Sequence, residues 1–155
     1  MKANRITTIA LTLLFSLSIC FTSAISAVSQ PTINVAVAQL NTADVGNFDK
    51  MVSLAKQAKF QGADLIIFPE ESVFGWLNPD VFTKATPIPG KYSEQFVAIA
   101  KGVNIWVAAG IAEQGPKAGP GSQKDAYQAY DSSILINPQG QIVLHHLILT
   151  HVKEF

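Results

Sequence analysis

The amino-acid sequence predicts an α/β fold with a mixed β-sheet. Three segments have the length and Val/Ile content of buried strands and alternate with segments of helical periodicity; they are 33–40, 64–68 and 104–110. This alternating order is typical of parallel strands joined by right-handed crossovers. Next, SSILI (132–136) and QIVLHHLIL (141–149) flank an Asn-Pro-Gln-Gly turn, which predicts an antiparallel hairpin.

The two helices are recognised by their apolar spacing and their end signals. Asn47 stands at the N-cap of the first helix, and Gly62 follows as its C-terminal stop. The second helix is predicted over residues 92–102, after a loop rich in proline and glycine. Residues 111–129 combine glycine, proline and polar residues without periodicity, so we expect a long surface loop there.

The N-terminus has the pattern of a signal peptide. MKANR precedes a long uncharged segment, and small residues at Ala24, Ser26 and Ala27 offer cleavage points. The serine and threonine content favours a cleaved signal over a retained membrane anchor, although the segment is long enough to span a bilayer. We therefore expect residues 1–27 to be a signal peptide and 28–155 to form the exported domain, in the periplasm or outside the cell.

Cleavage of this signal would change the charge and the cysteine content. The chain has eleven basic and eleven acidic residues, and loss of Lys2 and Arg5 would leave nine basic residues. We therefore expect no surface that attracts nucleic acid or an anionic membrane. Cys20, the single cysteine, would also leave, so the mature chain would have neither a disulfide nor a thiol nucleophile.

The segment DLIIFPEESVFGW places acidic residues directly after a buried strand. Pro69 has no N–H to continue a ladder, so the strand should stop there and place Glu70 at the carboxyl edge of the sheet, where open α/β folds bind ligands. A carboxylate there is a candidate general base, and the alternative is a solvated strand end with two ordinary surface glutamates. Because neighbours on an extended segment point to opposite faces, Glu70 and Glu71 are not expected to form the facing carboxylates of a glycosidase.

Other residues suggest weaker sites. Phe74 and Trp76 are candidates for lining a substrate pocket near Glu70, and packing against the sheet is the alternative for at least one of them. A cluster near residue 150 offers only two properly spaced metal ligands, so we expect neither a metal nor another cofactor. Its members are His145, His146, His151 and Glu154.

Five sequence blocks in order resemble the N-terminal part of the carbon–nitrogen hydrolases, the nitrilase superfamily. The blocks are INVAVAQLN, GADLIIFPE, IPG with its helix, VAAGIAE and YDSSILINPQG, and they cover residues 33 to about 144. The resemblance implies a four-layer αββα sandwich, here truncated to a mixed sheet with helices on one face. It also implies a small amide or nitrile substrate and, for an intact relative, a homo-oligomer paired through the outer face.

The resemblance further implies catalysis by a glutamate, a lysine and a cysteine. The thiolate would attack a nitrile or amide carbon, and water would hydrolyse the covalent intermediate. Glu70 falls on the Pro-Glu motif of the family and would be the general base, whereas Glu71 would not be catalytic. Glu113 falls on a Gly-x-x-Glu motif and would orient the lysine or the substrate by hydrogen bonding; the alternative is a loop carboxylate without a role.

The lysine and the cysteine are not found where the resemblance places them. The lysine, which stabilises the oxyanion, is expected near position 148, but Ile148 stands there and Lys153 follows five residues later. The cysteine is expected well beyond Phe155. We therefore expect a truncated or frameshifted copy of an exported hydrolase that is inactive alone. The alternatives are a non-catalytic fragment that acts as a binding or partner subunit, and an unrelated exported binding protein.

Overall fold

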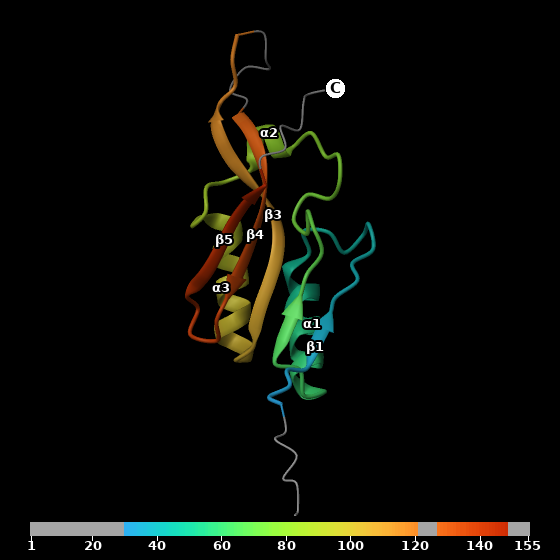
Figure 1. Cartoon of the computed structure of the whole chain (residues 1–155). Coiled ribbons are helices and arrows are strands. Elements are labelled where there is room, and N and C mark those ends of the chain that lie inside the picture. The colour runs from blue at the N-terminus through green and yellow to red at the C-terminus, as the bar shows by residue number, and fades with distance from the viewer. Residues whose placement is uncertain (1–29, 121–126, 149–155) are drawn as a thin grey trace, which may run out of the picture. The chain divides into compact units, whose positions relative to one another are not determined.

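The chain alternates between strands and helices and then forms three long strands (Figure 1). The computed structural model describes residues 30–120 and 127–148. In chain order its elements are β1 (Val35–Val37), α1 (Phe48–Phe60), β2 (Leu65–Ile67), α2 (Val81–Lys84), α3 (Lys91–Val103), β3 (Trp106–Lys117), β4 (Tyr127–Ile136) and β5 (Ile142–Ile148). The predicted signal peptide, residues 1–27, lies outside the described residues.

The strands form one mixed sheet in the order β1-β2-β3-β4-β5. β1, β2 and β3 are parallel, and β4 is antiparallel to both β3 and β5. The turn between β4 and β5 is closed by the Asn137 N–H, which donates to the Gln141 carbonyl (3.0 Å). The mixed sheet and the C-terminal hairpin that the sequence predicts are therefore confirmed.

α1 begins and ends where its sequence signals place it. The Asn47 side chain accepts a hydrogen bond from the Lys50 N–H (3.1 Å), which satisfies one of the free donors of the first turn. The buried residues Met51 and Ala55 lie one turn apart, on the face that packs against the sheet. Gly62, with φ of 87°, follows the last turn in the left-handed conformation that favours glycine.

α1 and α3 cover one face of the sheet, here called the helical face. The Phe96 ring of α3 lies at the centre of this core, with its centroid 5.3 Å from that of Phe48 and 5.6 Å from that of Phe68. Ile66 of β2 and Val107 of β3 pack into the same cluster. This confirms the predicted arrangement, in which the crossover helices share one face of a mixed sheet.

The opposite face, here called the open face, carries exposed apolar side chains. Strand register places Val35, Val37, Trp106 and Leu144 on this side, with exposed fractions of 45%, 75%, 37% and 49%. Exposed apolar side chains on one face of a sheet are typical of a region that contacts other protein. The four residues come from β1, β3 and β5, so the apolar surface extends across the sheet.

The prediction of a long loop over residues 111–129 is wrong at both ends. β3 continues to Lys117, and β4 begins at Tyr127, with Glu113 opposite Tyr130 in an antiparallel pair. A register shift between Gln114 and Lys117 accommodates the glycine and proline residues of this stretch. The prediction failed because cross-strand pairing and burial override the low strand propensity of such a sequence.

α2 was not predicted, because the segment that contains it is rich in turn-forming residues. Val81 of this short helix and the C-cap residue Ala85 pack against Ala112 and Ala129. These four residues form a second, smaller core cluster. Strand alternation directs Ala112 and Ala129 to the open face, so α2 covers a part of that face. Among the described helices, none is long and apolar enough to cross a membrane.

Candidate active site

Glu70 lies in a segment that follows β2 and remains attached to β3. The Phe68 N–H donates to the Ala108 carbonyl (2.8 Å). Further along, the Ser72 N–H donates to the Gly110 carbonyl (3.1 Å). A Cβ at position 110 would lie only 2.7 Å from the Glu70 Cα, so glycine at this position allows the close approach of the two backbones. As predicted, the strand ends before Pro69 and leaves Glu70 at the carboxyl edge of the parallel strands.

The chain after Pro69 is a turn and not the extended segment expected from the sequence. The Ser72 hydroxyl donates to the Pro69 carbonyl, and Glu71 has φ of 53°, in the left-handed region. This turn is the reason why Glu70 and Glu71 do not point to opposite sides of an extended strand. The Glu71 carboxyl lies close enough to Glu70 and Asp131 to respond to their charges, so it is not an ordinary surface glutamate.

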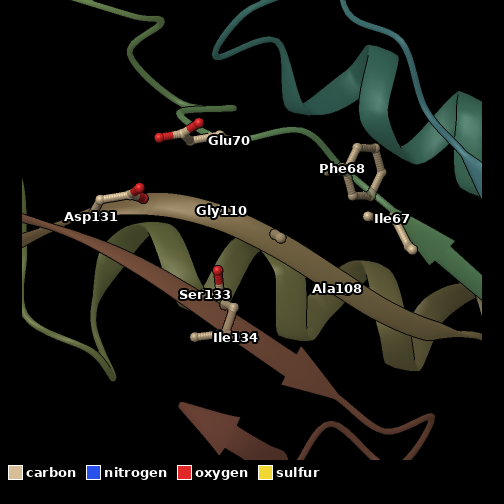
Figure 2. A pocket seen from close by; sticks show the side chains of 9 residues that line it. Ile67, Phe68, Glu70, Ala108, Gly110, Asp131, Ser133 and Ile134 are labelled. Carbon is tan, nitrogen blue, oxygen red and sulfur yellow. The ribbon is translucent and has the colours of Figure 1, made fainter. Parts of the chain in front are cut away.

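A pocket of about 290 Å³ lies beside Glu70 and is here called the Glu70 pocket (Figure 2). Its wall is mostly apolar and its polar side chains are Glu70, Asp131 and Ser133. Figure 2 shows Glu70 and Asp131 towards one end of the pocket, with Ile67 and Phe68 towards the other. The remaining lining residues are Ala108, Ala109, Gly110 and Ile134.

Asp131 is the most buried carboxylate of the pocket. It lies on β4 opposite Ala112, is only 9% exposed, and its Oδ1 has no hydrogen-bond partner among the described residues. Burial raises the pKa of Asp131 to about 6, with further contributions from a hydrogen bond to Glu70 and from the Glu70 charge. The Glu70 charge beside it therefore favours the protonated form of Asp131.

Glu71 is the third member of this acidic group. Burial, together with the charges of Asp131 and Glu70, raises its pKa to about 7. Its Oε2 is buried without a hydrogen-bond partner within the described part of the chain. Glu70, Glu71 and Asp131 together are here called the carboxylate cluster. They come from two segments that lie about sixty residues apart in the sequence.

Glu113 belongs to a different group on the helical face. Its Oε2 accepts a hydrogen bond from the Ser132 hydroxyl (2.6 Å) and lies 2.7 Å from His145 Nε2. Because Glu113 is an odd number of residues from Gly110 along β3, the two residues point to opposite faces of the sheet. The structure therefore brings Glu113 together with His145 and not with Glu70 or the Glu70 pocket.

The position at which the family resemblance predicts a lysine is adjacent to the carboxylate cluster in the sheet. Ile148, the last residue of β5, is the register partner of Asp131. Lys153, the later lysine, lies outside the described residues. A basic residue at position 148 would thus stand beside Asp131, and the chain has none at that position.

The two candidate aromatic residues do not line the Glu70 pocket. Phe74 is partly buried in both core clusters, and its ring packs edge-on against that of Tyr92, with the centroids 5.1 Å apart. Trp76 is 69% exposed. For Phe74 the position agrees with the alternative considered from the sequence, which is a role in packing.

The histidine cluster considered for a metal is not assembled in the described residues. His145 pairs with Glu113, and His146 is exposed on β5. His151 and Glu154 lie outside the described residues. Across residues 30–120 and 127–148, no group of three or more histidine, cysteine or carboxylate side chains has the spacing of a metal site.

Asp131 and Ser133 are site residues that the sequence prediction missed. In the segment YDSSILI, alternation places Ile134 and Ile136 in the core, and Asp131 and Ser133 on the other face. The alternation of polar and apolar residues in this segment could thus have indicated that Asp131 and Ser133 lie outside the core. The proximity of Asp131 to Glu70 could not be predicted, because it depends on the turn after Pro69 and on the register between β3 and β4.

The carbon–nitrogen hydrolase family model matches residues 34–153, so the chain belongs to the carbon-nitrogen hydrolase family. A formamidase from Helicobacter acinonychis is 30% identical over 97 residues, which are 59% of this chain and 26% of that enzyme. A nitrilase from Pyrococcus abyssi is 29% identical over 112 residues, which are 70% of this chain and 39% of that enzyme. The chain therefore spans well under half the length of these curated relatives.

Solved structures of amidases share the fold. An amidase from Nesterenkonia sp. AN1 superposes with a TM-score of 0.59 at 18% identity, covering 77% of this chain and 45% of the amidase. A mutant of that amidase carries acrylamide added at its active site cysteine. An N-terminal amidase superposes with a TM-score of 0.51 at 19% identity, covering 74% of this chain and 27% of that protein. The nitrilase-type fold predicted from the sequence is thereby confirmed over part of the length of these enzymes.

Proposed function

We propose that the chain is the N-terminal part of an exported hydrolase for small amides or nitriles, with Glu70 as its general base. The observation that carries this proposal is the position of Glu70, which the close approach to Gly110 holds at one end of a mostly apolar pocket of about 290 Å³. Small-molecule sites are typically apolar clefts of about this size or larger with few polar groups. The formamidase and nitrilase relatives support the amide or nitrile class.

In this proposal Glu70 takes the proton of a cysteine thiol, and later the proton of the water that hydrolyses the covalent intermediate. Attack on an amide forms a carbon–sulfur bond, and the proton held by Glu70 leaves with ammonia. Attack of water then breaks the carbon–sulfur bond, releases the acid and restores the thiol. Glu113, on the other face, holds His145 and is proposed to support the sheet near the site.

The chain by itself is proposed to be inactive. The amidase from Nesterenkonia sp. AN1 has an active site cysteine, whereas the single cysteine of this chain, Cys20, precedes the residues that match the family. The position expected for the lysine is occupied by Ile148. Without a thiolate and a cation to stabilise the oxyanion, a general base alone contributes only about 10²–10⁴-fold to such a reaction.

Ammonia release tests this proposal. The purified chain should release no ammonia from formamide, propionamide or propionitrile above the blank, both alone and with Glu70→Gln. Turnover that Glu70→Gln abolishes would contradict the inactivity but support the general base. Turnover that survives Glu70→Gln and is lost in Glu113→Gln would contradict the assignment of Glu70.

A second candidate function is that of a non-catalytic partner subunit, and the apolar open face favours it. Val37, the last residue of the edge strand β1, is 75% exposed, which is costly unless other protein covers it. Size-exclusion chromatography with a full-length relative tests this role. Co-elution that Val37→Asn weakens, and that the helical substitution Lys56→Gln leaves unchanged, is expected. Separate elution of the two proteins at micromolar concentration would exclude a stable complex.

Export is proposed from the N-terminal pattern alone. Expression of the whole chain in a bacterial host should give a product outside the cytoplasm whose mass lacks residues 1–27. The substitution Leu14→Arg should keep the chain in the cytoplasm, because the charge interrupts the apolar region. A product of full mass in the membrane fraction would indicate an uncleaved anchor instead.

A further inference from the structure

The carboxylate cluster has more acceptor oxygens than the surrounding residues have donors to satisfy. Asp131, at 9% exposed, has an unpartnered Oδ1, and Glu71 has an unpartnered and buried Oε2. Buried carboxylate oxygens are normally hydrogen-bonded, because an unsatisfied one costs about 1–3 kcal/mol. Two such oxygens beside a pocket, on neighbouring side chains, indicate that a donor from outside the described chain belongs there.

The described side chains around the carboxylate cluster do not supply this hydrogen-bond donor. β3 lines the Glu70 pocket from this side with Ala108 and Gly110, which carry no charge, and Ser133 of β4 is neutral. On the neighbouring helix α2, Lys84 is paired with Asp80 (2.7 Å). On β5, His146 is the register partner of Ser133 and is exposed. Within the described residues, no lysine or arginine forms an ion pair with the cluster.

We propose that the Glu70 pocket binds a small aliphatic molecule through a primary ammonium group, which the carboxylate cluster holds. An ammonium group has three N–H donors and no acceptor, which matches oxygens that can only accept. The apolar wall, to which Ile67 and Ala108 contribute side chains on the open face, fits a short alkyl chain. The site stands on the carboxylates and the pocket alone, so it goes beyond the proposed hydrolysis and does not depend on it.

A hydrated metal ion fits this site less well than an alkylammonium group. Calcium takes six to eight oxygen ligands, and magnesium keeps several water molecules in a near-octahedral shell. The Glu70 pocket has an apolar wall and only three polar side chains, and the described residues show no group with metal-ligand spacing. The apolar wall of the pocket contributes to binding only when the cation carries an apolar group.

Binding must depend on pH in a defined direction. The pKa values of Asp131 and Glu71 are raised to about 6 and about 7, and an ammonium ion favours the ionised carboxylates. By linkage, the ligand lowers both pKa values, and affinity falls as the pH decreases from 8 to 5. His146 is the register partner of Ser133 on the same face of the sheet, so measurements on His146→Gln separate its contribution.

The test is a titration of the full-length, ¹³C-labelled chain with n-propylammonium chloride at pH 8, followed by the carboxyl carbon resonances of Asp131, Glu70 and Glu71. Tetramethylammonium chloride, which has the same charge but no N–H donor, and sodium chloride are the controls at equal ionic strength. A saturable shift with propylammonium alone is expected. Equal effects of the three salts would mean simple screening of charge and would overturn the proposal, as would the absence of a saturable shift.

Two substitutions sharpen the result. Asp131→Asn preserves the shape of the side chain, and we expect it to weaken propylammonium binding by about tenfold or more, whereas Glu94→Gln, at an exposed carboxylate of α3, changes binding by less than about twofold. Unchanged affinity in a folded Asp131→Asn chain would contradict the site. If that variant does not fold, the comparison of the three salts on the unsubstituted chain still decides the matter. Failure of hydrolysis would not affect this readout, because it measures binding only.

Discussion

Two buried carboxylates, Glu113 and Asp131, lie on opposite faces of the same sheet and differ in how their oxygens are hydrogen-bonded. Glu113, on the helical face, is 9% exposed and accepts a hydrogen bond from Ser132 while it contacts His145. Asp131, on the open face, is also 9% exposed but has an unpartnered oxygen and two acidic neighbours. Equal burial thus has opposite consequences: the first carboxylate joins three strands, and the second is poised to accept a proton or a cation.

The two carboxylates differ in what they contribute to the protein. A satisfied buried carboxylate contributes to stability, whereas an unsatisfied one lowers stability and is retained where it binds or reacts. Glu113 and Asp131 are close together in the sheet, because Ala112, the residue before Glu113, is the register partner of Asp131. Strand alternation alone separates them into a structural group and a candidate binding group.

The largest effect is expected when Glu113 is removed. Glu113→Ala leaves the buried Ser132 hydroxyl and the more exposed His145 ring without their acceptor, and we expect a loss of about 3 kcal/mol in the free energy of unfolding. Urea denaturation followed by circular dichroism measures this. Glu113→Gln, which keeps one acceptor, should lose clearly less. Equal losses for the two variants would mean that packing, and not hydrogen bonding, is what Glu113 provides.

The next largest effect is expected at Gly110. A Cβ at this position would be 2.7 Å from the Glu70 Cα, so Gly110→Ala forces the two backbones apart, at a cost of about 2 kcal/mol. The same change moves Glu70 away from Asp131 and should lower the Asp131 pKa, because a hydrogen bond and a charge are weakened. Gly119→Ala is the control, since a Cβ there meets nothing within 4 Å. A Gly110→Ala chain with unchanged stability and an unchanged Asp131 pKa would contradict this packing.

Stability should rise on acidification, which is the reverse of the usual effect of paired carboxylates. The folded pKa of Glu71 is raised from 4.5 to about 7, and that of Asp131 from 3.8 to about 6. The folded chain therefore binds more protons than the unfolded chain in this range, and stability is lost as the pH rises through it. Between pH 8 and pH 5 we expect a gain of about 2 kcal/mol, after allowance for solvent screening.

Urea denaturation at pH 5, 6, 7 and 8 measures this gain. Glu71→Gln should reduce the dependence on pH and raise the stability at pH 8, because it removes a buried charge without a partner. Lys59→Gln, a substitution far from the cluster on α1, should leave the slope unchanged. A stability that increases from pH 5 to pH 8 would show that the carboxylates have ordinary or lowered pKa values.

The smallest effect is a comparison of two adjacent serines. Ser132 is fully buried and donates to Glu113, so Ser132→Ala should cost about 1 kcal/mol. Ser133 lines the Glu70 pocket on the other face, and Ser133→Ala should cost less than about 0.5 kcal/mol. Thermal unfolding of both variants in one buffer provides the comparison. Equal costs would mean that the two faces of β4 are not as different as the hydrogen bonds indicate.

Much of the sheet could be predicted because its signals are local. The apolar runs around Ile66 and Val107 and the Asn-Pro-Gln-Gly turn are each contained in a few residues, as is the Asn47 cap. The extension of β3 to Lys117 could not be predicted in this way, because it depends on pairing with β4. The same holds for α2, which is short and is stabilised by contacts with Ala112 and Ala129 rather than by its own sequence.

The amino-acid sequence by itself determined the family, the order of the strands and helices, and the place of Glu70 at the end of β2. These follow from hydrophobic periodicity, helix end signals and the order of short motifs, and each of these signals is contained in a few neighbouring residues. Only the tertiary structure decided which acids meet. The turn after Pro69 and the register of β4 bring Glu71 and Asp131 to Glu70, and strand alternation takes Glu113 to the other face. The physical reason is that side-chain proximity across a sheet depends on register and on backbone conformation at single residues, and neither can be read from the residue types alone.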